Sequence, residues 1–227
     1  HLTPKHAKKS ITRSLKSLKS DYSHLYFCHR PDPETPILET ARAMHTLLEQ
    51  GKVLYWGTSE WSPAQVVEAV ALCERYHLHP PKAEQPQYSM VVRDRVEQHL
   101  LPVTEPRGVG LVVWSPLAMG LLTGKYDDGI PDDSRFGREP WAKERYLTPE
   151  RIEMVRCLKP IADELGISRS QLALAWVLRQ PGVSSVITGA TRVSQIEENA
   201  KAADVELPAE VVDRIEQILS PGAAGEK

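Results

Sequence analysis

The sequence contains few of the residues and patterns that mark secreted or membrane-spanning proteins. Only three of its 227 residues are cysteines, and they lie far apart at positions 28, 73 and 157. An odd number without CxxC or Cys/His ligand spacing argues against a disulfide framework, and we expect no metal site. No apolar run approaches the roughly 18 residues of a membrane span, and no signal-peptide pattern is visible. We therefore expect a cytoplasmic protein with reduced thiols and no membrane insertion.

The sequence also has no large excess of positive or of negative charge. The net charge is −2, with 41% hydrophobic and 26% charged residues, which is typical of a globular chain with no nucleic-acid partner. The lysines of the first twenty residues alternate with Ile11, Leu15 and Leu18, which indicates the solvent face of an amphipathic helix. We expect one domain over residues 1–220 and a disordered tail over 221–227.

Short apolar runs alternate with helical patterns along the chain. Four hydroxyl-proline pairs are typical of helix starts, because the hydroxyl can cap free N–H groups and proline lacks one; they begin at Thr3, Thr35, Ser62 and Thr148. Ser62 and Ser168 are each followed three residues later by glutamine, the spacing of a capping box. Pro160 should kink or split the helix that follows Thr148. We expect strands at 24–28, 53–57, 83–86, 109–114 and 183–188.

Five strands separated by helices predict a parallel α/β sheet, and two architectures fit. A doubly wound sheet would carry a glycine-rich turn after its first strand, and the sequence lacks the pattern GxGxxG. A (β/α)8 TIM barrel needs eight strands, so five would make it incomplete. Residues suited to chemistry follow several successive strands, which favours the incomplete barrel, whose site is built from strand ends.

His29 is the first of these residues. It follows an apolar strand directly and precedes Arg30-Pro31-Asp32-Pro33, where the two prolines prevent the strand from continuing. An imidazole there can polarise a carbonyl or donate a proton near neutral pH. A structural role is the alternative for any single histidine. Asp32 and Arg30 are expected to fix the loop.

Polar and aromatic residues end the next three strands. The side chains of Ser59 and Gln85 could hydrogen-bond a carboxamide ligand. It is equally possible that Ser59 caps the backbone of its own turn and that Gln85 is a buried glutamine bonded to backbone groups. Trp114, followed by Ser115-Pro116-Leu117, offers a face for a planar heterocycle or is a core residue. Residues 118–147 are expected to form a long loop, in which Lys125 and Arg135 either hold a phosphate or are simply solvated.

The last strand leads through Gly189 and Thr191 into a helix containing Gln195, Glu198 and Asn199. A glycine turn that presents free N–H groups at a helix N-terminus is suited to an anion, and barrels commonly bind phosphate after the seventh and eighth strands. An ordinary helix N-terminus without a ligand is the alternative.

Together these segments resemble the aldo-keto reductase family, in the branch of the voltage-gated potassium-channel β-subunits and their microbial relatives. The resemblance runs from His1 to about Leu219, and it implies that the five strands match the fourth to eighth strands of the barrel. It also implies NADPH-dependent reduction of aldehydes and ketones, with His29 orienting the substrate carbonyl. Ser59 and Gln85 would hold the nicotinamide carboxamide, and Trp114 would stack on its ring.

The same resemblance implies the rest of the cofactor site. Ser115, Pro116 and Leu117 would follow the pyrophosphate together with Gly189, while Lys125, Arg135, Thr191 and Gln195 would surround the adenosine and its 2′-phosphate. Glu198 and Asn199 would contact the adenine. The positive charges of Lys125 and Arg135 favour NADP over NAD.

One part of the family pattern is missing. The catalytic aspartate, tyrosine and lysine belong upstream of His1, so we expect an N-terminally truncated enzyme that is inactive alone. Two alternatives remain: an NADP-binding regulatory subunit of a potassium channel, and an interaction module. A homo-oligomer is possible by the same resemblance, and the substrate would be a small carbonyl compound.

Overall fold

The computed structural model describes residues 2–220, so the disordered tail expected over 221–227 lies outside the described residues. Five strands form one sheet in the order β1-β2-β3-β4-β5. They are β1 (Ser23–Cys28), β2 (Val53–Ser59), β3 (Ala83–Gln85), β4 (Gly110–Trp114) and β5 (Val183–Ile187). Each lies where the sequence predicts a strand. The fold class is α/β, as predicted, and is consistent with an incomplete (β/α)8 barrel.

The first four strands are parallel and in a regular register. Leu25 pairs with Tyr55 across β1 and β2, Gly57 pairs with Ala83 across β2 and β3, and Ala83 pairs with Gly110 across β3 and β4. The carboxyl ends of parallel strands meet at the same edge of a sheet. The residues that follow β1, β2 and β3 therefore start from one edge.

The chain divides into two compact units, and each is described by itself. Unit 1 comprises the chain up to Pro86 together with Asp94–Val112, and unit 2 comprises Gln87–Arg93 and the chain from Val113 onward.

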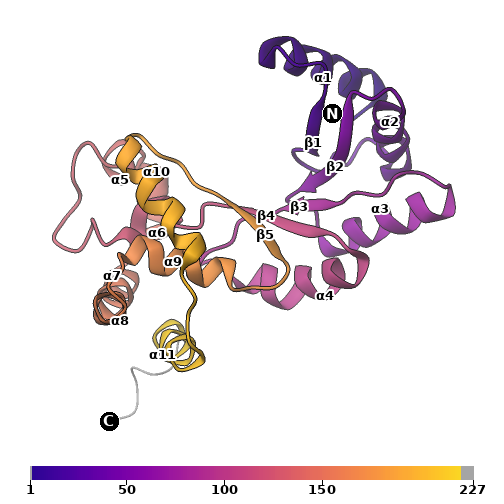
Figure 1. Cartoon of the computed structure of the whole chain (residues 1–227). Helices are drawn as coiled ribbons and strands as arrows, with labels where there is room; N and C mark the ends of the chain where they lie inside the picture. Colours follow the sequence, from indigo (N-terminus) through magenta and orange to yellow (C-terminus); the bar gives the residue numbers. More distant parts are fainter. Residues whose placement is uncertain (1, 221–227) are drawn as a thin grey trace. The chain divides into compact units, whose positions relative to one another are not determined.

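Unit 1 is built from helices packed in succession against β1 and β2 (Figure 1). Its core includes Ile11 from the first helix, Met44 from the second, Val66 from the third, and Trp56 from β2. The Trp56 indole N–H donates to the carbonyl of His79 at 2.8 Å, so its one polar atom is satisfied. The elements are α1 (Pro4–Leu18), α2 (Ile37–Glu49), α3 (Pro63–Arg75), η1 (Arg95–Leu100), α4 (Leu101–Thr104) and η2 (Glu105–Arg107).

Unit 2 contains the buried helix α9 (Arg169–Leu178), in which Trp176 is fully covered. The Trp176 ring lies between the guanidinium groups of Arg93 and Arg179, at 4.9 and 4.3 Å, and Glu216 accepts a hydrogen bond from the indole and from both arginines. Further elements are η3 (Ala118–Thr123), α5 (Arg135–Arg138), α6 (Pro140–Tyr146), α7 (Pro149–Cys157), α8 (Lys159–Glu164), α10 (Val193–Ala200), η4 (Lys201–Asp204) and α11 (Ala209–Leu219).

Most predicted helix starts are confirmed, and one is wrong. Ser62 caps α3 and Ser168 caps α9, each with the reciprocal glutamine of a capping box. Pro160 separates α7 from α8, as expected. Thr35 does not cap α2, because the helix begins two residues later at Ile37, with Pro36 at the N-cap position. The Thr35 hydroxyl donates instead to the Asp32 carboxylate at 2.8 Å, in the loop that precedes the helix.

The long loop predicted over residues 118–147 is also a wrong expectation. The segment contains η3, α5 and α6. Ser134 caps α5 by accepting from the Gly137 N–H at 3.2 Å, and Phe136, Ala142 and Tyr146 are buried. The apolar residues are too widely spaced to show a periodic pattern, so only their tertiary contacts define these short helices.

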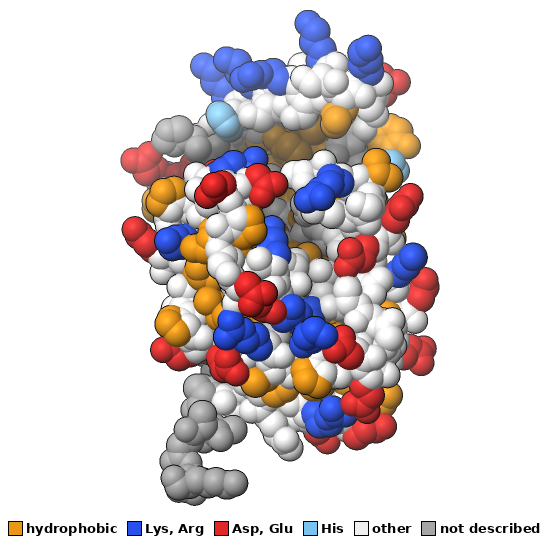
Figure 2. Space-filling model, turned by 90° about the vertical axis from the view of Figure 1, so that its left-hand side faces the viewer, with side chains coloured by type: hydrophobic (Ala, Val, Ile, Leu, Met, Phe, Trp, Pro, Cys, Tyr) orange, Lys and Arg blue, Asp and Glu red, His pale blue; other side chains and the backbone are white. Residues whose placement is uncertain are grey.

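On the face drawn in Figure 2, basic side chains predominate along the upper edge, and acidic and basic side chains are intermixed below it. Among the described residues, no helix has the length and apolar character needed to cross a bilayer.

Candidate functional site

His29 lies directly after β1, and its side chain is exposed. The loop that follows is fixed by Asp32, whose carboxylate accepts hydrogen bonds from the Leu2 N–H at 2.6 Å, the Thr35 hydroxyl and the Glu34 N–H. These bonds, that of Leu2 first, lower the pKa of Asp32. The His29 imidazole is therefore exposed at the end of a strand, beside a loop that hydrogen bonds hold in place. The sequence predicts this placement for a group that contacts a substrate.

Ser59 and Gln85 end the next two strands and lie side by side. The Ser59 hydroxyl is buried and donates to the Gln85 carbonyl at 2.9 Å, so its oxygen can still accept a hydrogen bond from an N–H group. The side-chain amide of Gln85 is half-buried and has no hydrogen-bond partner within the described part of the chain. An acceptor hydroxyl beside a free amide is suited to a carboxamide ligand.

Glu84 is a residue of this site that sequence reasoning missed. It is fully buried in β3, where its carboxylate accepts hydrogen bonds from the Thr58 hydroxyl and from the Trp61 N–H at 3.2 Å. Burial raises the pKa of Glu84 to about 7, against the lowering effects of the Thr58 bond and the Arg95 charge. The one sequence signal that could have revealed Glu84 is the presence of an acidic residue inside a predicted strand.

The Glu84 carboxylate organises the turn that carries Ser59. Glu60 in this turn has a φ of 58°, a left-handed conformation that costs free energy outside glycine. Arg95 holds the turn by donating to Glu60 at 2.8 Å and to the Trp61 carbonyl at 2.8 Å. Burial also raises the pKa of the neighbouring Cys28 thiol to about 12, with the Glu84 charge adding to the effect, so this thiol is not a nucleophile.

In unit 2, β4 ends in a strained turn. Trp114 is half-buried, Ser115 has a φ of 56°, and Ala118 and Met119 also have positive φ values. The Ser115 hydroxyl is buried and, among the described residues, has no hydrogen-bond partner. Pro116 is buried and Leu117 half-buried. Left-handed non-glycine backbone together with an unsatisfied hydroxyl is typical of a ligand-binding turn.

Lys125 and Arg135 are both exposed, and the structure brings their segments together. The residues next to them, Tyr126 and Phe136, stack with ring centroids 4.4 Å apart, and the Tyr126 hydroxyl accepts from the Phe136 N–H at 3.3 Å. The contact brings the two segments together, and the Lys125 ammonium lies 5.2 Å from the centre of the Tyr126 ring.

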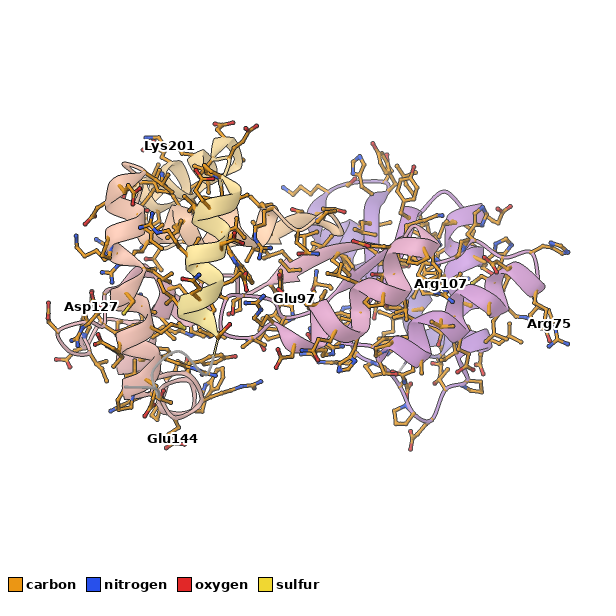
Figure 3. All side chains as sticks on the ribbon, turned by 90° about the horizontal axis from the view of Figure 1, so that it is seen from below. Arg75, Glu97, Arg107, Asp127, Glu144 and Lys201 are labelled. Atoms are coloured by element: carbon orange, nitrogen blue, oxygen red, sulfur yellow. The ribbon has the colours of Figure 1, made fainter. Side chains whose placement is uncertain are left out.

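The Lys125 segment is anchored to α9. Arg169 donates to the Asp127 carboxylate at 2.7 Å and to the Val155 carbonyl at 3.2 Å; Asp127 is labelled in Figure 3. The guanidinium crosses so close to Gly124 that a Cβ there would lie 1.8 Å from the nearer Arg169 nitrogen. Gly124 has a φ of 80°, so glycine is required both for its backbone conformation and for this contact.

The segment after β5 is exposed at Gly189 and Thr191 and half-buried at Glu198 and Asn199. A Cβ on Gly189 would meet no atom within 4 Å, so this turn borders open space. The N–H groups of Thr191 and Arg192 donate to the Gln195 side chain at 2.8 and 3.3 Å. Gln195 thus occupies the two N–H groups that directly precede α10, and an anion that bound these two groups would have to displace its side chain.

Helix α9 links the two predicted cofactor segments of unit 2. Arg169 in its first turn holds the segment of Lys125, and Gln171 donates from its side-chain nitrogen to the Glu198 carbonyl at 3.0 Å. The oxygen of the same Gln171 amide caps the Ser168 N–H at 3.0 Å. One glutamine thus completes a capping box and fixes the end of α10.

A hollow of about 640 Å³ in unit 1 borders the turn that follows β2, and the predicted site residues do not line it. Its walls come from the start of α3 and from η1 and α4, and include Ser62, Arg95 and His99. In contrast to the strand ends, it brings no unsatisfied buried group together with a titratable one.

The sequence model described as "Aldo/keto reductase family" matches residues 1–220. This chain belongs to the aldo/keto reductase family. The predicted resemblance is therefore confirmed at the level of the family, and the parallel five-stranded α/β sheet corresponds to part of the family's (β/α)8 barrel.

Curated relatives of this chain are named as β-subunits of voltage-gated potassium channels. The chain is 50% identical over 223 residues to a "Probable voltage-gated potassium channel subunit beta" of Arabidopsis thaliana, covering 96% of this chain and 68% of the relative. A protein of the same name from Oryza sativa subsp. japonica is 49% identical over 223 residues, with the same coverage. A "Putative voltage-gated potassium channel subunit beta" of Schizosaccharomyces pombe is 43% identical over 225 residues, which are 96% of this chain and 65% of that protein.

Proposed function

We propose that the chain supplies the cofactor-binding residues and the carbonyl-orienting histidine of an NADPH-dependent reductase of aldehydes and ketones. The observation that carries the cofactor assignment is the Tyr126–Phe136 contact, which brings together the segments of two exposed bases, Lys125 and Arg135. Bases from two neighbouring segments suit the 2′-phosphate that distinguishes NADPH from NADH. Membership of the aldo/keto reductase family supports the same assignment.

Within each unit, the residues present fit one part of such a cofactor. Ser59 and Gln85 offer an acceptor and a free amide for the nicotinamide carboxamide, and Trp114 offers its half-exposed ring for stacking. The unsatisfied Ser115 hydroxyl, with Pro116, Leu117 and Gly189, would border the pyrophosphate. Thr191, Gln195, Glu198 and Asn199 would surround the adenosine.

NADPH supplies the hydride in the proposed reduction. His29 would donate a hydrogen bond to the carbonyl oxygen of the substrate, which holds the carbon in place and polarises the C=O bond. Proton transfer in the family needs a tyrosine that we do not assign to any residue of this sequence. The proposal therefore separates cofactor binding, which this chain can be tested for directly, from turnover.

Cofactor binding is tested by titrating the chain with NADPH and NADH and following tryptophan fluorescence. The double substitution Lys125→Met and Arg135→Met should weaken NADPH binding by at least about tenfold while leaving NADH binding nearly unchanged. The matched control is Arg138→Met with Lys143→Met, two exposed bases of the same segment. Equal losses in both double variants, or no NADPH binding by the unaltered chain, would contradict the assignment.

Turnover is tested in a chimaera in which this chain replaces the matched region of the Arabidopsis thaliana relative. We expect aldehyde-dependent oxidation of NADPH, and His29→Ala should lower kcat by about 100-fold with little change in the Kd for NADPH. The exposed histidine His24 provides the control substitution. A chimaera that binds NADPH but reduces no member of a broad carbonyl panel would refute the reductase proposal.

The names of the relatives favour a second candidate function. We propose as the alternative that the chain is an NADP-binding regulatory subunit of a potassium channel, because the three relatives described above are named as channel β-subunits. Co-purification of the chimaera with a voltage-gated potassium channel, together with a current that changes on NADPH addition, would support it. Absence of any carbonyl turnover in the same preparation would distinguish it from the reductase.

A further inference from the structure

Two histidines and a glutamate from two separate segments of the chain meet on the surface of unit 1. His45 and Glu49 lie on α2, and His79 lies in the segment between α3 and β3. The Nδ1 atoms of His45 and His79 are 2.8 Å apart, and His79 Nδ1 is 3.8 Å from the Glu49 carboxylate. The three potential ligand atoms all lie within 4.8 Å of one another.

The local structure holds these side chains in place. His45 and Glu49 are one turn apart on α2, so they share a helix face. The segment of His79 is fixed by its carbonyl, which accepts the Trp56 indole N–H at 2.8 Å. The His79 backbone N–H also points at His45 Nδ1, at 3.4 Å, and the imidazole rings stack with centroids 4.8 Å apart. The lone pair of His45 Nδ1 is thereby directed into the cluster.

We propose that His45, Glu49 and His79 form a binding site for a divalent transition-metal ion. Neutral imidazole nitrogen and carboxylate oxygen are ligands that such ions prefer over aliphatic or hydroxyl groups. The His79 and Glu49 side chains are 48% and 62% exposed, so an ion can enter from solvent and water can fill its remaining positions. The site retains open coordination positions because only three protein ligands converge on it.

The donor set indicates which ions fit. Imidazole nitrogen together with carboxylate oxygen and water suits Ni²⁺, Cu²⁺ and Zn²⁺, and the affinity of such a site rises from Ni²⁺ to Cu²⁺ and falls again at Zn²⁺. The 2.8 Å between the two nitrogens is the length of a hydrogen bond, so the rings must turn when an ion replaces it. We therefore expect Cu²⁺ to bind most tightly of the three.

Binding changes the tautomer of one ring. Without an ion, the 2.8 Å contact requires one ring to donate its Nδ1–H to the lone pair of the other, and the lone pair of His45 assigns the donor role to His79. An ion that takes both Nδ1 lone pairs needs His79 as its Nε2–H tautomer, so the proton moves through solvent from Nδ1 to Nε2 of the same ring and the neutral pair releases no net proton. The ion then links α2 to the segment that leads into β3.

The site is separate from the proposed cofactor site. His79 precedes β3, which begins at Ala83, whereas Ser59 and Gln85 lie at the carboxyl ends of their strands. Metal binding and carbonyl reduction therefore use opposite ends of the strands of unit 1, and failure of one proposal leaves the other untouched.

The direct test is calorimetric titration of the whole chain, without a polyhistidine tag, with NiCl₂, CuCl₂ and ZnCl₂. We expect one Ni²⁺ or Cu²⁺ per chain. His45→Ala and His79→Ala should each weaken binding by more than about tenfold, because losing even an outer partner of a metal ligand costs about 10- to 100-fold. His6→Ala, which removes an exposed histidine of α1, should bind as the unaltered chain does.

Two further measurements keep the test decisive. Electron paramagnetic resonance of the Cu²⁺ complex should report two nitrogen ligands, and thermal melting should shift upward with Ni²⁺ in the unaltered chain but not in a His45→Gln, His79→Gln variant that has a native circular dichroism spectrum. Stoichiometric binding that survives in that variant, a copper spectrum without imidazole nitrogens, or no binding by the unaltered chain would each overturn the proposal.

Discussion

At the residue scale, Glu84 is a carboxyl group whose environment differs strongly from that of the unfolded chain. Its pKa rises from 4.5 to about 7 on folding because the carboxyl is buried. The folded state therefore holds a proton that the unfolded state releases above pH 4.5. The contribution of Glu84 to stability is complete below pH 4.5 and decreases as the pH rises to about 7, by roughly 3 kcal/mol.

Glu84→Gln should remove this dependence. A glutamine can still accept from the Trp61 N–H and donate to the Thr58 hydroxyl. Between pH 4.5 and pH 8, the free energy of unfolding of the variant should rise by roughly 3 kcal/mol relative to that of the unaltered chain, as measured by urea unfolding at each pH. Glu74→Gln, at an exposed position of α3, is the control and should show no such gain. A constant difference between variant and unaltered chain would show that Glu84 titrates normally.

Gly57 illustrates a second constraint at the residue scale. A Cβ at this position would lie 2.6 Å from the Ala83 carbonyl oxygen and 2.8 Å from the Phe27 ring. Gly57→Ala should therefore lower the free energy of unfolding by about 1–3 kcal/mol through overpacking between β2 and β3, seen as a lower Tm. The same substitution at Gly189, where a Cβ meets nothing within 4 Å, should leave the Tm nearly unchanged. Equal Tm changes would contradict this account.

At the element scale, Gln171 links the start of α9 to the end of α10. Gln171→Glu keeps the oxygen that caps Ser168 but replaces the donor to the Glu198 carbonyl with an acceptor. If Glu198 and Asn199 contact the adenine as proposed, losing this hydrogen bond removes about 1 kcal/mol of the free energy that holds them in place. The Kd for NADPH should therefore rise roughly fivefold in a fluorescence titration.

The control for this prediction is Gln65→Glu, the same change in the capping box of α3. Helicity from circular dichroism should stay the same in both variants, since the capping oxygen is retained. An NADPH affinity that is unchanged in Gln171→Glu, or equally weakened in Gln65→Glu, would mean that the link to α10 has no part in cofactor binding.

Elements were predictable from the sequence where their signals are local. The strands and the serine-capped helices follow from apolar periodicity and from residues three apart, and both lie where predicted. The Thr35 bond to Asp32 is also local, three residues apart, but it competes with the helix-start signal of the threonine-proline pair. The helices within 118–147 depend on tertiary contacts that no local pattern contains. For the same reason His29, Ser59 and Trp114 could be selected as strand-end residues, whereas Glu84 and the His45–His79 pair became visible only in the folded chain.

At the scale of the whole molecule, one face of the sheet has an apolar surface that the described residues leave partly open. Tyr55 is 56% exposed, and its register partner Leu25 and the nearby Phe27 are only half-buried. The strand β1 that carries two of these residues is an edge strand, the first in the sheet order, so its outer backbone groups have no strand partner among the described residues. Exposed apolar surface beside an unpaired strand edge favours association between copies of a chain.

We therefore expect the chain to self-associate with increasing concentration, measured by static light scattering. Tyr55→Lys places a charge in the exposed apolar surface and should shift the chain toward the monomer, because a lysine beside a strand edge resists pairing with a second sheet. Tyr76→Lys is the control, since Tyr76 is 39% exposed but lies at the end of α3 and contacts Arg42 and Arg75 instead of the sheet. A mass that stays monomeric at all concentrations, or that responds equally to both substitutions, would show that β1 and its neighbours do not drive association.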